Sequence, residues 1–107
     1  ADHWDSLRSG YFTDAVRDQT MEQIILPTLR GMKAEGRPFV GVLFAGLMIS
    51  PDGPKLIEYN VRFCDPECQT LMRRLTSDLA PVLLAAAHGA LTTTPLEWGA
   101  HQAVTVV

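Results

Sequence analysis

Hydrophobic and polar positions alternate without a break in the segment L-I-E-Y-N-V-R-F, residues 56–63. Every second residue from Ile57 onward is apolar or aromatic, and the residues between them are Glu58, Asn60 and Arg62. Side chains on a β-strand point alternately to opposite faces. The pattern therefore predicts a strand with one buried face and one face that carries the three polar residues.

A strongly apolar run, F-V-G-V-L-F-A-G-L-M-I, precedes this segment at residues 39–49. Both alternating sets in it are apolar, which predicts a strand covered on both faces. A buried helix is the alternative, but two glycines and several β-branched residues favour a strand. S-P-D-G-P, at residues 50–54, has the composition of a turn. We therefore expect an antiparallel hairpin in which the alternating strand comes second.

Helical periodicity appears on both sides of the predicted hairpin. Before it, an amphipathic helix is expected to begin after Thr13 as N-cap and to end at Gly36, with a kink or a division at Pro27. After it, Asp65 is expected to cap a short helix, and Ser77 to cap a second one. These elements predict an α/β (α+β) fold in which the antiparallel hairpin packs against helices.

The expected domain covers residues 13–107, with residues 1–12 as a poorly ordered lead-in. Q-A-V-T-V-V, at residues 102–107, is predicted to be a strand in which the sequence stops. Natural domains seldom end in this way, so we expect the chain to be a truncated piece of a longer protein.

The bulk composition is that of one small globular domain, with 107 residues, 47% hydrophobic and 20% charged. A net charge of −3 gives no general attraction to nucleic acid or to an anionic membrane. No apolar run reaches the roughly 20 residues that span a bilayer, and the first residues do not resemble a secretory signal. Cys64 and Cys68 lack a second pair with zinc spacing and are expected to be reduced thiols. We expect a cytoplasmic protein.

The polar face of the second strand is suited to binding a metal and a phosphate. Next-but-one residues on a strand lie about 6.5–7 Å apart, so the side chains of Glu58 and Asn60 can reach one ion. Carboxylate and amide oxygens suit Mg²⁺, and Arg62 could donate two hydrogen bonds to a phosphate. The pattern alone leaves an alternative open, which is the solvated polar face of an ordinary edge hairpin.

Longer motifs around this strand carry a resemblance to a known family. The combination of G-V-L-F-A-G-L-M, D-G-P-K and I-E-Y-N-V-R-F-C-D-P-E-C-Q is similar to the phosphoribosylamine–glycine ligases (glycinamide ribonucleotide synthetases) of the ATP-grasp superfamily. I-L-P-T-L-R-G-M-K-A-E-G-R-P-F and A-V-T-V-V match the same family. The chain thus resembles a C-terminal part of the family's ATP-grasp domain. One departure is Cys64, where the family usually has glycine.

The resemblance implies roles for individual residues. Glu58 and Asn60 would ligate Mg²⁺ or Mn²⁺, and Arg62 would contact the phosphates of ATP or an acyl phosphate. Asp65 and Glu67 match the family's D-P-E and would position the substrates. For Asp65, a plain role as helix cap is the alternative.

The resemblance also implies an activity for the intact protein. It would join phosphoribosylamine and glycine to give glycinamide ribonucleotide, ADP and phosphate, in purine biosynthesis. The isolated chain is expected to be inactive, and its exposed strands to favour self-association. Two alternatives are a non-catalytic binding or assembly module that retains the ATP-grasp fold, and another ATP-grasp carboxylate–amine ligase.

Overall fold

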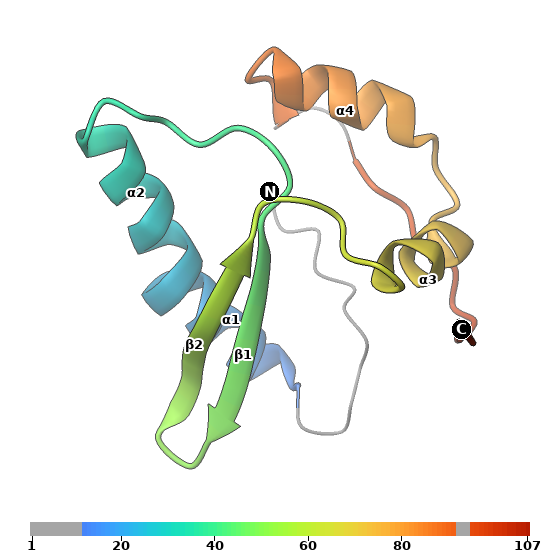
Figure 1. Cartoon of the computed structure of the whole chain (residues 1–107), viewed down its shortest axis with the longest axis horizontal. Helices are drawn as coiled ribbons and strands as arrows, with labels where there is room; N and C mark the ends of the chain where they lie inside the picture. The colour runs from blue at the N-terminus through green and yellow to red at the C-terminus, as the bar shows by residue number, and fades with distance from the viewer. Residues whose placement is uncertain (1–11, 92–94) are drawn as a thin grey trace. The chain divides into compact units, whose positions relative to one another are not determined.

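A computed structural model describes residues 12–91 and 95–107, so the predicted lead-in lies outside the described residues except for Phe12. Helical segments precede and follow a single pair of strands, as expected for helices packed with an antiparallel hairpin (Figure 1). In chain order they are α1 (Asp14–Thr20), η1 (Met21–Ile25), α2 (Leu26–Ala34), β1 (Phe44–Ser50), β2 (Gly53–Asn60), α3 (Glu67–Arg74) and α4 (Leu79–Ala87).

The chain divides into two compact units. In the part that the structure describes, the first unit contains residues 12–39 and 45–59, which include the N-terminal helices and most of the hairpin. The described part of the second unit comprises residues 40–44, 60–91 and 95–107, which include α3, α4 and the C-terminal segment. Along the described chain there is no helix long and apolar enough to cross a membrane.

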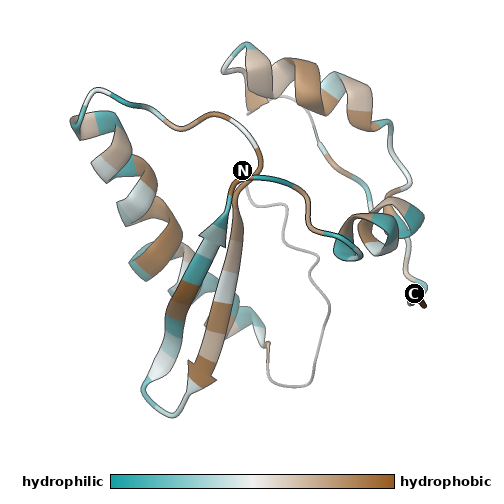
Figure 2. Ribbon diagram, in the orientation of Figure 1, coloured by the Kyte–Doolittle hydropathy of each residue, from teal (hydrophilic) through white to brown (hydrophobic). Residues whose placement is uncertain are grey.

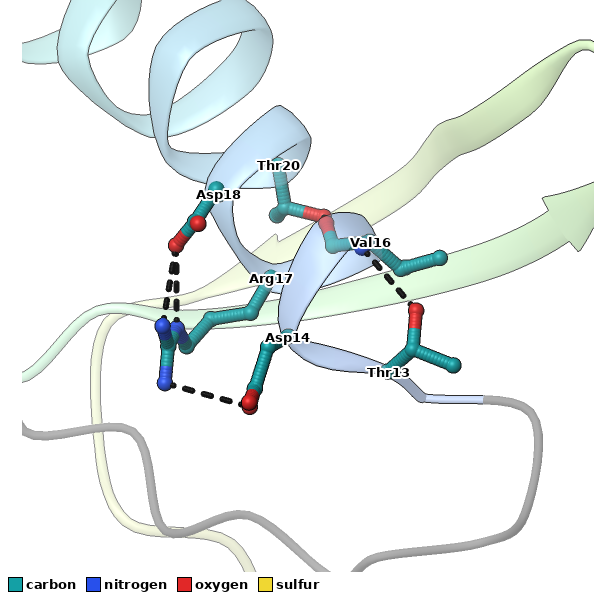
Figure 3. Close-up of polar contacts among 6 residues, drawn as sticks. All are labelled: Thr13, Asp14, Val16, Arg17, Asp18 and Thr20. Atoms are coloured by element: carbon teal, nitrogen blue, oxygen red, sulfur yellow. Dashed lines mark hydrogen bonds and ion pairs between the residues drawn. The ribbon is translucent and has the colours of Figure 1, made fainter.

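The N-terminal helix begins as the sequence predicts. Thr13 is the N-cap of α1, and its Oγ1 accepts a hydrogen bond of 3.3 Å from the backbone N–H of Val16 (Figure 3). The Arg17 guanidinium pairs with Asp14 at 3.4 Å and with Asp18 at 3.0 Å. These ion pairs are solvent-accessible and contribute little, whereas the cap satisfies a backbone donor that has no partner within the helix.

Pro27 divides this helix, as expected, but through a single π-helical turn. Proline has no N–H to donate to the carbonyl four residues before it. The preceding turn widens into η1, where the N–H of Leu26 bonds to the carbonyl of Met21, five residues back. The Thr28 hydroxyl donates to the carbonyl of Ile24 at 2.8 Å, which adds a side-chain bond to the turn around Pro27.

The helix ends at the predicted glycine. Gly36 has φ 75°, a conformation that glycine adopts without steric cost. Its N–H bonds to the carbonyl of Lys33 at 3.1 Å, and the N–H of Arg37 bonds to the carbonyl of Met32 at 2.9 Å. This pair of bonds is a Schellman motif, which satisfies carbonyls that the helix end leaves open.

The predicted hairpin is present, although both strands have shifted boundaries. β1 and β2 form a two-stranded antiparallel sheet joined at Pro51 and Asp52. Residues 39–43 precede β1 without strand structure, and β2 starts earlier than expected and ends at Asn60.

The prediction that the first strand is covered on both faces is wrong. Met48, on β1, is 58% exposed, although Figure 2 shows β1 as largely apolar. Ile57, on the predicted buried face of β2, is 63% exposed. Within the first unit, helices pack against one side of a sheet of two strands, which cannot cover both faces and both edges.

A small core lies between the helices and the hairpin of the first unit. Ile25 of η1 and Ala45 of β1 are 6% and 8% exposed. Thr20 is fully buried, and its hydroxyl donates to the carbonyl of Val16 at 2.7 Å, so burial leaves this donor satisfied.

In the second unit, both predicted helix caps are displaced by one residue. Pro66 is the N-cap of α3 and makes no side-chain cap bond, whereas Asp65 accepts a hydrogen bond from the Gln69 side chain at 3.1 Å. Asp78 caps α4 by accepting from the N–H of Ala80 at 3.0 Å. The predictions of Asp65 and Ser77 as caps are therefore wrong. At α4 the neighbouring Asp78 accepts the backbone donor in place of Ser77, whereas at α3 the Asp65 carboxylate bonds to a side chain and no side chain caps the helix.

The C-terminal segment lies along the end of α3. The N–H of Thr76 bonds to the carbonyl of Glu97 at 2.9 Å, and the N–H of Gly99 bonds to the carbonyl of Arg74 at 2.7 Å. The predicted strand over residues 102–107 is absent, since these residues have no regular structure. Val104 and Val106 are 85% and 88% exposed, whereas Thr105 between them hydrogen-bonds to Thr70 of α3 at 2.8 Å.

Candidate functional site

Glu58 and Asn60 lie at next-but-one positions of β2, and the strand ends at Asn60. Arg62 therefore does not continue the strand, as the alternation had predicted, but lies in the bend that follows it. Its guanidinium Nη1 donates to the carbonyl of Phe63 at 3.3 Å. The strand thus presents the carboxylate and the amide, and the exposed arginine lies on a segment that is not constrained by a ladder of hydrogen bonds.

Gly46 of β1 lies opposite Glu58 in the hairpin. A Cβ atom built on Gly46 would come within 3.1 Å of Glu58 Cγ and 3.6 Å of the Glu58 carbonyl oxygen. Paired residues of an antiparallel ladder place their side chains on the same face of the sheet. The Glu58 side chain consequently lies over Gly46, in space that any larger residue would occupy.

Tyr59 fixes β2 to the N-terminal helices from the opposite face. Its hydroxyl makes a hydrogen bond of 2.8 Å with Thr28 Oγ1 and donates to the carbonyl of Ile24 at 3.3 Å. The π turn therefore presents the Ile24 carbonyl to the strand, and the first turn of α2 presents the Thr28 hydroxyl. The residue between the two predicted metal ligands is in this way attached to the helix behind the hairpin.

The predicted substrate residues Asp65 and Glu67 flank Pro66 at the start of α3. Asp65 is exposed, and its carboxylate accepts the Gln69 side-chain hydrogen bond described above. Glu67 is half-buried, and its Oε2 atom is buried with no hydrogen-bond partner among the described residues. A carboxylate oxygen in that position is suited to accept a hydrogen bond from a cationic or N–H group.

The chemistry of the side chains on β2 fits a divalent cation. Mg²⁺ is usually held by one or two protein oxygens, with water and substrate phosphates as its other ligands. Glu58 and Asn60 supply two such hard oxygens, and Gly46 leaves the carboxylate side chain room over the sheet. In the described ranges, β2 included, no group of three or more His, Cys, Asp or Glu side chains could hold a metal ion.

Two residues of this region were not assigned a role from the sequence. Gly46 was one of the two glycines taken to favour a strand over a helix, and the hairpin shows that it leaves room for the side chain of Glu58. Tyr59 was assigned to a buried face without a partner, because its bonds to Thr28 and Ile24 join residues more than 30 positions apart.

Comparison with known proteins identifies the family. The family model described as "Phosphoribosylglycinamide synthetase, ATP-grasp (A) domain" matches residues 7–68, more than half of the 107 residues. The chain therefore belongs to this family of ATP-grasp domains.

Individual relatives carry a narrower name. A phosphoribosylamine–glycine ligase of Caulobacter vibrioides is 59% identical over 96 residues, covering 89% of this chain and 22% of the relative. The enzyme of Rhizobium meliloti with the same name is 61% identical over 90 residues, covering 84% of the chain and 21% of the relative. A chloroplastic phosphoribosylamine–glycine ligase of Arabidopsis thaliana is 59% identical over 97 residues, covering 89% and 18%. The chain thus spans about a fifth of the length of these curated relatives.

Proposed function

We propose that this chain is the part of an ATP-dependent phosphoribosylamine–glycine ligase that carries the metal-binding strand. The observation that supports this most strongly is the 59% identity to the Caulobacter vibrioides ligase over 96 residues, which spans most of the chain. In the proposed reaction, ATP converts the glycine carboxylate to an acyl phosphate. The amine of phosphoribosylamine then attacks, giving glycinamide ribonucleotide, ADP and phosphate.

In this proposal Glu58 and Asn60 hold Mg²⁺ or Mn²⁺. The ion would neutralise phosphate oxygens as negative charge develops on them. Arg62 binds the phosphates of ATP or the acyl phosphate by charge-assisted hydrogen bonds. Its place in a bend beyond the end of β2 gives its side chain freedom to leave the Phe63 carbonyl when a phosphate is present.

Asp65 and Glu67 position the amine-bearing substrates. The buried Oε2 atom of Glu67, which has no protein partner in the described structure, supports this role. An ammonium or amine N–H bound there would satisfy the oxygen and orient the nitrogen. Either the glycine ammonium or the amine of phosphoribosylamine has the required donors.

A segment that spans about a fifth of its relatives is expected to be inactive alone. The direct test is a chimera in which residues 12–107 replace the matching segment of the Caulobacter vibrioides ligase. We expect the chimera to form glycinamide ribonucleotide and ADP only when ATP, glycine, phosphoribosylamine and Mg²⁺ are all present.

Point variants of the chimera separate the metal ligands from general damage to the hairpin. Glu58→Ala is expected to abolish turnover, whereas Lys55→Ala, an exposed position on the same strand, is expected to retain it. A folded chimera with no activity would instead favour the non-catalytic binding module. ADP formation with a different carboxylic acid, and not with glycine, would favour another ATP-grasp ligase.

The proposal includes a cytoplasmic location, which fractionation of the source cells would test. Because one relative is chloroplastic, an organelle is the alternative outcome.

The proposal also includes self-association of this chain through its strands. Phe44 and Met48 are 36% and 58% exposed on β1, and the described sheet has only two strands. Light scattering should show concentration-dependent oligomers that Met48→Lys weakens. A monomer at high concentration would contradict self-association.

A further inference from the structure

The two cysteines of the chain flank the segment that contains Asp65, Pro66 and Glu67. Cys64 lies just before this segment, and Cys68 is the second residue of α3. Both thiols are free and partly exposed, and neither has been given a role in the proposed reaction. The sequence contains no other cysteine, so any intramolecular thiol chemistry is confined to this pair.

The backbone brings the two cysteines together. The N–H of Cys68 donates to the carbonyl of Cys64 at 2.7 Å, which closes a single turn of the helical type. With standard backbone bond lengths, that hydrogen bond places the two Cα atoms at most about 6.6 Å apart. Disulfides join residues whose Cα atoms lie about 4.4–6.8 Å apart, so no rearrangement of the chain is needed to bring the Cα atoms into range.

The Cys64 thiol is not held by strong bonds elsewhere. Its only described hydrogen bond is a contact of 3.9 Å from Sγ to the carbonyl of Arg62, which is long even for sulfur. Rotation about χ1 can therefore turn this sulfur towards Cys68 at little cost.

We propose that Cys64 and Cys68 form a dithiol that hydrogen peroxide or an organic peroxide oxidises to an intramolecular disulfide. One thiolate attacks the peroxide, which breaks the O–O bond and gives a sulfenic acid and water or an alcohol. The second thiol then attacks the sulfenic sulfur, forms the S–S bond and releases water. The pair loses two electrons and two protons, and the peroxide is reduced by the same two electrons.

The disulfide closes a ring around Asp65, Pro66 and Glu67. A ring of this size restricts the backbone on which the two carboxylates are carried and the start of α3. If the proposed ligase function holds, oxidation therefore slows turnover of the chimera reversibly, by impairing the placement of the substrate amine. That consequence rests on the proposed function, whereas the thiol chemistry does not.

The thiol chemistry is tested on the chain itself. Treatment with hydrogen peroxide should remove both titratable thiols and lower the mass by two hydrogen atoms, in a monomer that dithiothreitol restores. Oxygen addition to the cysteines, or a disulfide-linked dimer, as the main product would overturn the proposal.

Two further measurements distinguish a preformed pair from two cysteines that are merely close in sequence. The native chain should form the internal disulfide several-fold faster than the chain unfolded in urea, since folding holds the two residues in one turn. Equal or slower oxidation of the native chain would contradict this.

Phenylarsine oxide, which bridges close thiols, should bind the native chain one to one. It should not bridge two thiols in Cys64→Ser or Cys68→Ser. If the wild-type chain binds phenylarsine oxide no better than these variants, the proposal is overturned. This measurement involves no oxidation of the thiols.

The functional consequence has its own control. Peroxide should inhibit the active chimera in which all other cysteines are replaced, and Cys64→Gly, which has the residue usual in the family, should remove that inhibition. Internal disulfide formation without any loss of activity would refute the effect on the substrate residues and leave the dithiol itself established. An inactive chimera would count against the proposed function alone.

Discussion

The hydrogen bonds of Tyr59 give the sharpest test of how β2, the strand that carries Glu58 and Asn60, is held against the N-terminal helices. Tyr59→Phe removes a hydroxyl that bonds to Thr28 Oγ1 at 2.8 Å and to the carbonyl of Ile24 at 3.3 Å. A partly buried hydrogen bond contributes about 0.5–1.5 kcal/mol net, and the longer of the two lies at the weak end of that range. We therefore expect the free energy of unfolding to fall by about 1–2 kcal/mol. For a domain of this size that corresponds to a loss of several degrees in Tm.

A double-mutant cycle isolates the contact between the two hydroxyls. Thr28→Val removes the same contact and also the bond from Thr28 to the Ile24 carbonyl. Combined with Tyr59→Phe, it should show a coupling free energy of about 0.5–1.5 kcal/mol. Urea unfolding followed by circular dichroism gives all the free energies required.

The matched control pairs Tyr59→Phe with Thr70→Val. Thr70 hydrogen-bonds to Thr105 and shares no described partner with Tyr59, so these two changes should be additive. Strict additivity of Tyr59→Phe and Thr28→Val would refute the inference that the strand is fastened to the helix at this point.

Two predictions concern glycines that differ in the space around them. Gly46→Ala places a methyl group 3.1 Å from Glu58 Cγ, so in the chimera it should raise the Mg²⁺ concentration for half-maximal velocity several-fold with an unchanged circular dichroism spectrum. An unchanged Mg²⁺ dependence would show that Glu58 does not need this space. Gly53→Ala should destabilise the chain by at least about 1–2 kcal/mol, because φ is +106° and the new Cβ lies 2.5 Å from a glutamine side chain. Gly31→Ala is the control for the Gly46 and Gly53 variants, because Gly31 lies in α2 with open space around it. In urea unfolding it should raise the free energy of unfolding by about 0.5–1 kcal/mol.

Local signals in the sequence predicted the helices, the hairpin and several of their ends. Thr13 caps α1, and Gly36 ends α2 at positive φ. Pro27 marks the division of the first helix. Each of these features depends on the backbone chemistry of one residue and its immediate neighbours, which is why it can be read from the sequence.

Features that depend on distant partners were predicted less well. The alternation of residues 56–63 continues past Asn60, but a strand lasts only as long as its partner, and β1 starts at Phe44. Burial of Met48 and Ile57 was overestimated because apolar sequence shows what a face favours and not what covers it. The same reasoning explains residues 102–107, where β-branched residues alone do not make a strand.

The candidate site shows the same division. The spacing of Glu58 and Asn60 on one strand was predicted from period two alone. The space over Gly46 and the attachment of Tyr59 required the register and the fold. The proximity of Cys64 and Cys68 required the turn that joins them.

The central claim is that Glu58 is a ligand of the catalytic divalent cation. The most direct measurement is the Mg²⁺ dependence of the chimera's ligase velocity with Glu58→Gln, which keeps the size of the side chain and removes its charge. We predict that the half-saturating Mg²⁺ concentration rises at least about tenfold, because a hard cation loses its charged protein ligand. A Mg²⁺ dependence equal to that of the unmodified chimera would contradict the account.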